Sequence, residues 1–261
     1  MCKQLNLDKN YYNQKGLWDK YINNKYEIIR ARETIRFIPQ SVKSIIDIGC
    51  GNGTVTDMID KPFVVGLDFA RIPLSNSKCR IIQASIDSLP IKSGKFDLVI
   101  LTEVLEHLSE DVFIGAIEDI SRLRPKYILI TVPFNENIEV ELAKCNSCGN
   151  RFNINHHYRA FIGNWCESLF PDYTIECISY ASYRNPPNLA LASLRKTCGV
   201  FTYSKFAVCN NCGGTTSPSN NPIKFIFNAL NLIDICLKKL ARIEKPYHQI
   251  ILLKLKSNES D

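Results

Sequence analysis

Glu103, Glu106 and His107 have the types and spacing of a metal or acid–base site. They follow an apolar run at 96–101 that has the pattern of a buried strand. Spacings of three and four residues place Glu103 on one helical face with Glu106 and His107. Two carboxylates and an imidazole on one face can bind a divalent cation. The alternatives are a general base, supplied by His107 or by the later His157, and histidines that only pack.

Two matching Cys-x-x-Cys-Gly units form the second group of residues that could do chemistry. They are Cys145-Asn-Ser-Cys148-Gly and Cys209-Asn-Asn-Cys212-Gly, with about 60 residues between them. Four thiolates at this spacing suit tetrahedral zinc, and the glycine permits the tight turn. Because four thiolates leave no open coordination position, we expect a structural ion; two reduced surface pairs or redox dithiols are the alternatives. The other cysteines expected to pack as small hydrophobes are Cys50, Cys79, Cys166, Cys177 and Cys236.

The third group is a glycine-rich turn. Residues 44–54, SIIDIGCGNGT, predict a strand that runs into this turn and then a helix near 53–60. Glycines let the backbone approach a ligand and adopt positive φ, and the helix amino terminus offers free N–H groups. The dinucleotide fingerprint needs glycine at its first, third and sixth positions. Here Gly49, Gly51 and Gly53 are first, third and fifth and Thr54 is sixth, which argues against an NAD enzyme.

Short apolar runs alternate with helical segments between residues 44 and 132, as in a parallel sheet with helices on both faces. Helices are expected near 73–77 and 109–124, and an amphipathic helix at 17–38 that Pro39 ends. The expected strands are Ser44–Ile48, Phe63–Leu67, Arg80–Gln83, Phe96–Leu101 and Tyr127–Val132.

After residue 132 this rhythm breaks. Two polar loops, 135–158 and 183–222, each hold one cysteine pair, and a helix at about 159–170 and a strand at 173–180 lie between them. Both loops follow parallel strands and leave the same carboxyl edge of the sheet. One ion could therefore bridge them beside the substrate cleft and hold a lid that is too polar to fold alone.

A very apolar helix is expected at 223–243, before a last strand at 248–256. It carries Lys238, Lys239 and Arg242 near its end. We expect it to be buried in the core; the alternative is that it rests on a membrane holding a lipid-linked substrate.

The order of these features resembles the class I S-adenosylmethionine (SAM)-dependent methyltransferases, over about residues 44–133 and the strand 248–256. The resemblance implies a Rossmann-like α/β fold, with a seven-stranded sheet, helices on both faces and here a zinc-bound insertion or lid. In that family the loop is acidic-x-Gly-x-Gly-x-Gly, and a carboxylate after the second strand, here Asp68, holds the ribose hydroxyls. The family often has Asp where Ser85 stands, contacting the adenine amino group; serine can also accept a hydrogen bond. The implied SAM contacts are Asp47, Gly49, Cys50, Gly51, Gly53, Asp68, Phe69, Ser85, Ile86 and Thr102.

The Glu-x-x-Glu-His cluster is similar to the metal site of two branches, the ubiquinone-biosynthesis O-methyltransferases and the small-RNA terminal 2′-O-methyltransferases. In the RNA enzymes a later histidine completes the site, and His156 or His157 could supply it. The resemblance implies that Mg²⁺ or another divalent cation lowers the pKa of the acceptor hydroxyl. The implied ligands are Glu103, Glu106, His107 and His157, and the catalytic candidates are His107, Glu103 and His157.

The later segments resemble bacterial methyltransferases of surface-glycan and natural-product biosynthesis. The resemblance rests on a Val-Pro-Phe turn at 132–134, the first cysteine pair, a His-x-Arg-x-Phe element at 157–161 and a Pro-Tyr-His strand at 246–248. It implies methyl transfer from SAM to a hydroxyl of a sugar or other glycan or natural-product acceptor. An RNA methyltransferase and a non-catalytic SAM- or zinc-binding partner module are the alternatives. Arg159 is expected to pair with a surface carboxylate rather than with an anionic substrate.

The 261-residue chain has the composition of a soluble globular protein, with 45% hydrophobic residues and a formal charge of +6. It has neither a run of like charges nor a concentrated basic stripe with aromatics, so nucleic acid is not the expected partner. No apolar leader follows Met1, so we expect a reducing cytoplasm. The predicted parts are an N-terminal helical lid at 1–40, a SAM-binding core at 41–134, a first zinc knuckle and substrate loop at 135–158, a core continuation at 159–182, a second knuckle loop at 183–222 and a C-terminal helix and closing strand at 223–261.

Overall fold

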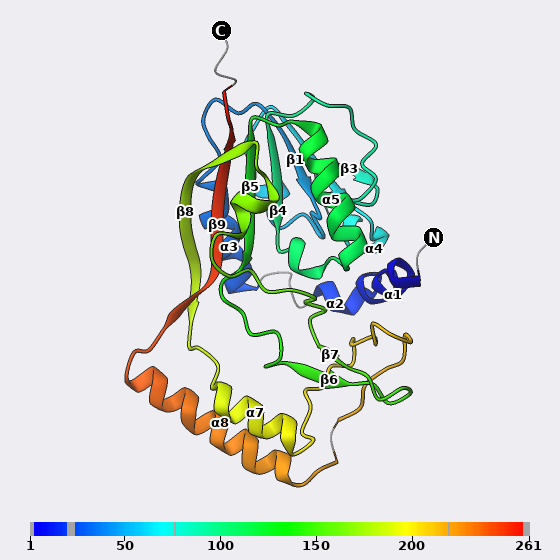
Figure 1. Cartoon of the computed structure of the whole chain (residues 1–261), viewed down its shortest axis with the longest axis vertical. Helices are drawn as coiled ribbons and strands as arrows, with labels where there is room; N and C mark the ends of the chain where they lie inside the picture. Colours follow the sequence, from blue (N-terminus) through cyan, green and yellow to red (C-terminus); the bar gives the residue numbers. More distant parts are fainter. Residues whose placement is uncertain (1–2, 20–23, 76, 219, 258–261) are drawn as a thin grey trace.

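The computed structural model, which describes residues 3–19, 24–75, 77–218 and 220–257, is built around a seven-stranded sheet (Figure 1). The strand order is β3-β2-β1-β4-β5-β9-β8. The five strands expected between residues 44 and 132 are confirmed with small shifts at their ends, and the two later strands are longer than expected. Their bounds are β1 Ser44–Ile48, β2 Phe63–Asp68, β3 Arg80–Gln83, β4 Leu98–Thr102, β5 Tyr127–Pro133, β8 Tyr173–Arg184 and β9 Lys245–Leu255.

The first five strands are parallel, and β9 runs antiparallel between β5 and β8. β8 therefore points the same way as β5, as expected for the strands that precede the two cysteine loops. The register pairs Pro133 of β5 and Ala181 of β8 with His248 of β9. His248 is thus fixed at the carboxyl edge of the sheet, where ligands bind in open α/β folds.

Helices cover both faces because the central strands are apolar along their whole length. All five residues of β4 are buried, as are six of the seven residues of β5. One face packs on α5 (Glu110–Leu123) and α6 (Trp165–Leu169) through Ile120 and Cys166. The other face packs under the segment 37–42.

The N-terminal helices differ from the expected single helix at 17–38. They are α1 (Lys3–Tyr12), α2 (Lys15–Asp19) and α3 (Lys25–Ile35), and residues 20–23 of the expected helix lie outside the described part. The helix expected near 53–60 is only a 3₁₀ turn, η1 (Thr56–Met58), because β-branched residues and the nearby Pro62 disfavour an α-helix there. The helix expected near 73–77 is α4 (Arg71–Leu74), and the segment after β4 forms a second 3₁₀ turn, η2 (Leu105–His107).

The second half of the chain contains more regular structure than its polarity suggested. A short hairpin, β6 (Leu142–Lys144) and β7 (Arg151–Asn153), holds the first cysteine pair between its strands. The region 183–222, expected as a loop, contains α7 (Leu189–Thr197). Asn188 caps this helix by accepting a hydrogen bond from the Leu191 N–H, a start signal that its sequence already carried. The helix expected at 159–170 shrinks to α6, since Gly163 has a φ of +71°.

Helix α8 (Ile223–Leu240) is where burial differs most from expectation. Core burial was predicted for the helix at 223–243, but Phe227 is the one residue of α8 that is buried. Cys236, expected to pack as a small hydrophobe, is exposed for the same reason. Figure 1 shows α7 and α8 at one end of the molecule, away from the body of the sheet and beyond the β6–β7 hairpin. No helix within the described residues is both long and apolar enough to cross a membrane.

Candidate functional site

The glycine turn after β1 forms the floor of a cleft of about 330 Å³ at the carboxyl edge of the sheet. Gly49, Gly51 and Gly53 all have positive φ, at +76°, +53° and +82°. A Cβ at Gly49 would lie 2.4 Å from Val104, and one at Gly51 would lie 2.7 Å from the Trp18 ring, so only glycine fits under these neighbours. The sequence prediction for the turn is confirmed in conformation.

Asp68 at the end of β2 is tied to this turn through one carboxylate oxygen, and its other oxygen bonds to the backbone just after β2. Its Oδ2 accepts the N–H of Gly51 at 2.9 Å and its Oδ1 accepts that of Ala70 at 2.8 Å. Burial nevertheless raises its pKa to about 6, because the side chain is almost withdrawn from water. Each oxygen retains a free lone pair that a ligand hydroxyl could use.

The cleft gathers most of the residues that the sequence pointed to. Those that line it are Gly49, Cys50, Gly51, Asp68, Phe69, Ser85, Ile86, Thr102, Glu103, His107 and His157. Asp47 and Gly53 do not line it. The fully buried Asp47 instead accepts the Thr56 hydroxyl at 2.6 Å beneath the turn, and Gly53 faces Ser77 and Asp57. The Ser85 hydroxyl is hydrogen-bonded to Asp87.

The N-terminal helices cover the cleft from the side opposite the sheet. Tyr12 places its ring edge against His107, with ring centroids 5.9 Å apart, and against Phe69, at 5.6 Å. The Trp18 indole N–H donates to the Tyr12 carbonyl at 2.7 Å, which holds the indole ring over the glycine turn. These aromatic residues of α1 and α2 were not singled out from the sequence, because nothing local shows which distant loop they meet.

Glu106, His107 and His157 form a compact group beside the cleft. One ligand atom from each lies within 4.8 Å of the others. Glu106 is fully buried and neither carboxylate oxygen has a hydrogen-bond partner. Burial and the nearby Glu103 raise the Glu106 pKa well above its usual value. An ionised carboxylate in this position needs a cation, and a neutral one needs a proton.

The two histidines of this group have ring nitrogens that could bind a metal ion. His107 Nδ1 has no hydrogen-bond partner, and burial next to His157 lowers the His107 pKa to about 3. The ring is therefore neutral at physiological pH, the form that binds a metal. The Nδ1 atom of His157 meets the Glu136 carboxylate at 2.5 Å, and its ring is 4.6 Å from that of His107. Because a carboxylate only accepts, this bond leaves His157 Nε2 free to act as a ligand.

Glu103 sits at the edge of the group in a strained conformation, with a φ of +56°. Its Oε2 lies 3.2 Å from Nε2 of His248 on β9, while its Oε1 has no hydrogen-bond partner. The His248 pairing lowers the Glu103 pKa to about 2, although burial opposes this shift. The sequence predicted Glu103 but not His248 or Glu136, which come from strands and loops far along the chain.

The polar wall opposite the glycine turn was also missed. It includes Glu27 and Arg30 of α3, Arg184 of β8 and Tyr247 of β9. Arg30 donates to Glu27 through Nε at 3.1 Å and through Nη2 at 2.6 Å, and its Nη1 is buried with no hydrogen-bond partner. Arg159 is not part of this wall. It pairs with the exposed carboxylate of Glu110 at 2.8 Å, as expected.

The four knuckle cysteines converge at the far side of the β6–β7 hairpin, and all four sulfurs lie within 4.8 Å of one another. The Cys145 and Cys212 sulfurs are 3.5 Å apart, and those of Cys148 and Cys209 are 3.7 Å apart. Tetrahedral zinc with bonds of about 2.3 Å sets its sulfurs about 3.8 Å apart. Backbone N–H groups also point at the sulfurs, and that of Asn150, with the Cys212 thiol, lowers the Cys148 pKa to about 6. The spacing and the donors therefore suit a zinc ion bound by thiolates.

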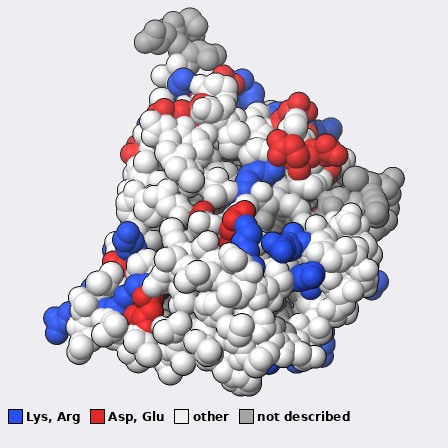
Figure 2. All heavy atoms as spheres, turned by 60° about the horizontal axis from the view of Figure 1, so that its bottom comes forward, with Lys and Arg blue, Asp and Glu red and all other residues white. Residues whose placement is uncertain are grey.

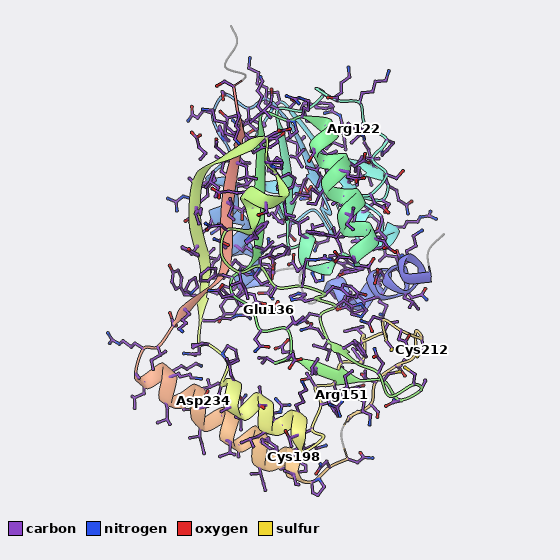
Figure 3. The ribbon with its side chains drawn as sticks, viewed as in Figure 1. Arg122, Glu136, Arg151, Cys198, Cys212 and Asp234 are labelled. Atoms are coloured by element: carbon purple, nitrogen blue, oxygen red, sulfur yellow. The ribbon has the colours of Figure 1, made fainter. Side chains whose placement is uncertain are left out.

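The segments that carry the cysteine cluster contact residues that line the cleft or lie next to it. Figure 3 places Cys212 beside the hairpin and Glu136 between the hairpin and the sheet. Gln14 of the N-terminal segment donates to the carbonyl of Phe206 at 2.8 Å, just before the second knuckle. The hairpin strand β7 ends at Asn153, whose Oδ1 accepts the His157 N–H at 3.5 Å. The segments beside the cluster thus contact both the N-terminal segment that carries Tyr12 and Trp18 and the backbone of His157.

The central part of the chain is similar to known proteins. Residues 46–126 match the family described as the methyltransferase domain. A ubiquinone biosynthesis O-methyltransferase of Bartonella quintana is 29% identical over 108 residues, 37% of this chain and 44% of that protein. An uncharacterised protein of Methanocaldococcus jannaschii is 32% identical over 97 residues, 35% of this chain and 38% of that protein. The chain spans about half the length, or less, of these curated relatives.

Solved structures share the fold. A SAM-dependent methyltransferase of Archaeoglobus fulgidus superposes with a TM-score of 0.51 at 16% identity, covering 91% of this chain and 98% of that one. The magnesium protoporphyrin IX methyltransferase of Synechocystis PCC 6803 with bound SAM superposes with a TM-score of 0.53 at 12% identity, covering 70% and 93%. The family match shows that residues 46–126 are similar to a methyltransferase domain, and these superpositions show that the chain shares the fold of the solved methyltransferases.

Proposed function

We propose that the protein transfers the methyl group of SAM to a hydroxyl oxygen, with a divalent cation held by Glu103, Glu106, His107 and His157. The observation that carries this proposal is the buried Glu106 carboxylate, which has no hydrogen-bond partner and lies beside two histidine nitrogens. A methyl transfer that needed only alignment of donor and acceptor would not require this group. Glu103 and His107, on either side of Glu106 in the sequence, line the cleft after β4, at the carboxyl edge of the sheet where we expect the ligand to bind.

On the cofactor side, the chain's own residues would bind and orient the nucleoside. Asp68 would accept the ribose hydroxyls, with its carboxylate already held by the Gly51 and Ala70 N–H groups. Ser85 and Ile86, in the segment after β3, line the cleft where the adenine would lie. The Trp18 and Tyr12 rings would exclude water from the bound donor, which strengthens the interactions inside the cleft.

On the acceptor side, the carboxylate oxygens suit a hard divalent ion such as Mg²⁺ or Mn²⁺, and the imidazole nitrogens also suit a transition-metal ion. Such an ion, when bound, lowers the pKa of the acceptor hydroxyl. Glu136 would hold the His157 ring in the orientation that leaves Nε2 toward the site. His248 would position Glu103 in the same way.

The acceptor we favour is a sugar or another hydroxyl-rich glycan or natural-product group. The wall that includes Glu27, Arg30, Arg184 and Tyr247 offers donors, acceptors and an aromatic surface within one cleft. Several hydroxyls could be recognised there through polar contacts that fix orientation. The curated relatives named as O-methyltransferases support the oxygen acceptor.

We also propose that Cys145, Cys148, Cys209 and Cys212 bind one structural zinc ion. Their sulfur spacing supports this, and so does the small core at this site, whose six buried residues include Cys145 and Cys209 themselves. A core of this size leaves the loops 135–158 and 198–217 in need of another source of stability. The ion would hold the lid and His157 in place and would not take part in the chemistry.

The proposal is tested by methyl transfer from tritiated SAM to a panel of acceptors, with Mg²⁺ or Mn²⁺ and again after EDTA. The panel contains nucleotide sugars, catechols and an RNA oligonucleotide with a free 3′ end. We expect cation-dependent labelling of a hydroxyl acceptor that Glu106→Gln abolishes, while Glu118→Gln, an exposed carboxylate elsewhere, leaves it unchanged.

Each outcome separates the candidate functions. Labelling of the RNA alone, weakened by salt, would assign the site to an RNA methyltransferase. SAM binding without turnover on every acceptor would favour a non-catalytic partner module. Labelling that survives EDTA and Glu106→Gln would refute the cation's role and leave a general base in its place.

A further inference from the structure

The apolar side chains of α8 face away from the protein. Phe225 is 66% exposed, Leu232 62% and Leu240 84%. At 100° per residue, these side chains and their neighbours fall within less than half of the helix circumference. The full apolar face consists of Phe225, Ile226, Ala229, Leu230, Leu232, Ile233, Cys236, Leu237 and Leu240, every one of them exposed.

The opposite side of the same helix contacts α7 and the residues just before it. Asp234 accepts a hydrogen bond from Asn188 at 3.0 Å and pairs with Lys238, which also donates to the Pro186 carbonyl at 3.0 Å. A surface helix of a soluble protein has the opposite orientation, with its apolar stripe toward the core. An apolar face of this extent on the outside is a binding surface.

Basic side chains frame this face. Lys224 lies near its first turn, and Lys239, Arg242 and Lys245 lie near or just beyond its last. Glu244 is the single acidic residue at that end, since Asp234 is already paired with Lys238. Figure 2 shows a broad surface without charged side chains in its lower half, with Lys and Arg toward its margins. An apolar centre with a cationic margin is complementary to a bilayer whose headgroups are anionic.

We propose that α8 docks the protein on an anionic lipid bilayer, lying in the interface plane with its apolar face among the headgroups and upper acyl chains. The helix has only 18 residues and six of them are polar or charged, which fits a helix in the plane and not across it. A second copy of the chain is the less favourable occupant. Seated antiparallel on this face, it would bring its own Lys239 and Arg242 against Lys224.

The docking helix is joined directly to the cleft. The α7–α8 segment is inserted between β8, which ends at Arg184, and β9, which begins at Lys245. Arg184 and Tyr247, next to these two ends, both line the cleft. Contact through α8 would therefore hold the cleft beside the bilayer surface. This inference does not depend on the activity proposed above.

The test is co-sedimentation of the full chain with sucrose-loaded vesicles of phosphatidylcholine alone or with one quarter phosphatidylglycerol. We expect the wild-type chain to pellet with the anionic vesicles and much less with the neutral ones. The double variant Ile226→Gln/Ile233→Gln should weaken this partitioning by about tenfold or more. Its matched control is Ile114→Gln/Ile162→Gln, which makes the same replacements at residues that are 52% and 69% exposed, against 60% and 55% in α8.

Both double variants should keep the wild-type unfolding temperature, because all four side chains are exposed. Amide hydrogen exchange of the wild-type chain gives a second readout that needs no variant: anionic vesicles should slow exchange in 223–243 and leave α5 unchanged. Wild-type chain that stays in the supernatant with anionic vesicles, or a control variant as impaired as the α8 variant, would overturn the proposal. A wild-type dimer in light scattering that Ile226→Gln/Ile233→Gln converts to a monomer would assign the face to a second copy instead.

Discussion

Replacing Asp68 by alanine should weaken binding of S-adenosylhomocysteine by about 10²- to 10³-fold. The carboxylate would lose two hydrogen bonds to the ribose, each worth about 1.5–3 kcal/mol for a charged acceptor. The variant also leaves the Gly51 and Ala70 N–H groups without their present acceptor, at 2.9 and 2.8 Å, so the glycine turn would be less well ordered before binding. At the lower end of that range the two hydrogen bonds account for about 3 kcal/mol, and the less ordered turn adds up to about 1 kcal/mol, which together correspond to the expected weakening.

The pKa of Asp68 adds a second, independent signature. Burial raises this pKa to about 6, so the free protein carries the carboxylate at pH 7 but mostly the neutral acid at pH 5. The ligand hydroxyls need the ionised acceptor, so affinity should fall by about tenfold between pH 7 and pH 5. The Asp68→Asn variant, which cannot ionise, should bind weakly at both pH values and show no such step.

Isothermal titration calorimetry with S-adenosylhomocysteine at both pH values measures these effects. The control is Asp57→Ala, because Asp57 also accepts backbone and side-chain hydrogen bonds, from Lys78 and Ser77, but lies outside the cleft. Affinity of Asp68→Ala within about threefold of wild type, or equal losses in both alanine variants, would refute the assignment of the ribose to Asp68.

Three further predictions concern the cation group, the cysteine cluster and the sheet. Mn²⁺ should raise the unfolding temperature of the wild-type chain and of Glu118→Gln but not of Glu106→Gln; an equal rise in all three would place the ion elsewhere. Cys148→Ser should lose bound zinc, measured by atomic emission, and unfold at a lower temperature, whereas the exposed Cys198→Ser should retain both; unchanged zinc in the first variant would end the single-ion proposal. Asp97 accepts the Lys43 and Ser44 N–H groups and pairs with Lys126, contacts that hold its pKa below the usual value, so its carboxylate stabilises the fold above about pH 4 and this contribution is lost as the pH falls further. Urea unfolding should therefore show Asp97→Asn less stable by about 1–2 kcal/mol at pH 7, with the gap narrowing toward pH 2; a gap that is constant with pH would contradict this.

The parts of the fold that depend on local sequence were predicted well. Apolar runs with turn residues between them define β1, β2, β4 and β5 within a few residues, because a strand buried on both faces must be apolar throughout, and the largely exposed edge strand β3 was also predicted. The glycine turn was also predicted, since three glycines at alternate positions permit the positive φ values that are found there. The resemblance then placed Asp68 at the cleft. Because β1 and β2 are parallel neighbours, the residue at the end of β2 lies beside the turn that follows β1.

The predictions failed where local propensity and tertiary packing disagree. The periodicity of α8 correctly indicated a helix, but an apolar stripe does not reveal whether it faces the core or the outside. Polar side chains of α8 form hydrogen bonds with Asn188 and Pro186. Because these contacts hold the polar side inward, the apolar stripe faces outward. In contrast, α7 was not predicted. Asn188 and the Leu- and Ala-rich segment after it favour a helix, but the residues around them are polar and indicated a loop.

The same distinction between local sequence and tertiary packing applies to the cleft. The sequence by itself determined which groups could do chemistry: the glycine turn, the Glu-x-x-Glu-His cluster and the two cysteine pairs, each made of residues a few positions apart. Only the tertiary structure decided which of them meet. The antiparallel placement of β9 sets His248 against Glu103, the loop after β5 sets Glu136 against His157, and the cysteine pairs converge although about 60 residues separate them. Such pairings depend on strand order and register over the whole chain, which the packing of the complete core determines and no short segment contains.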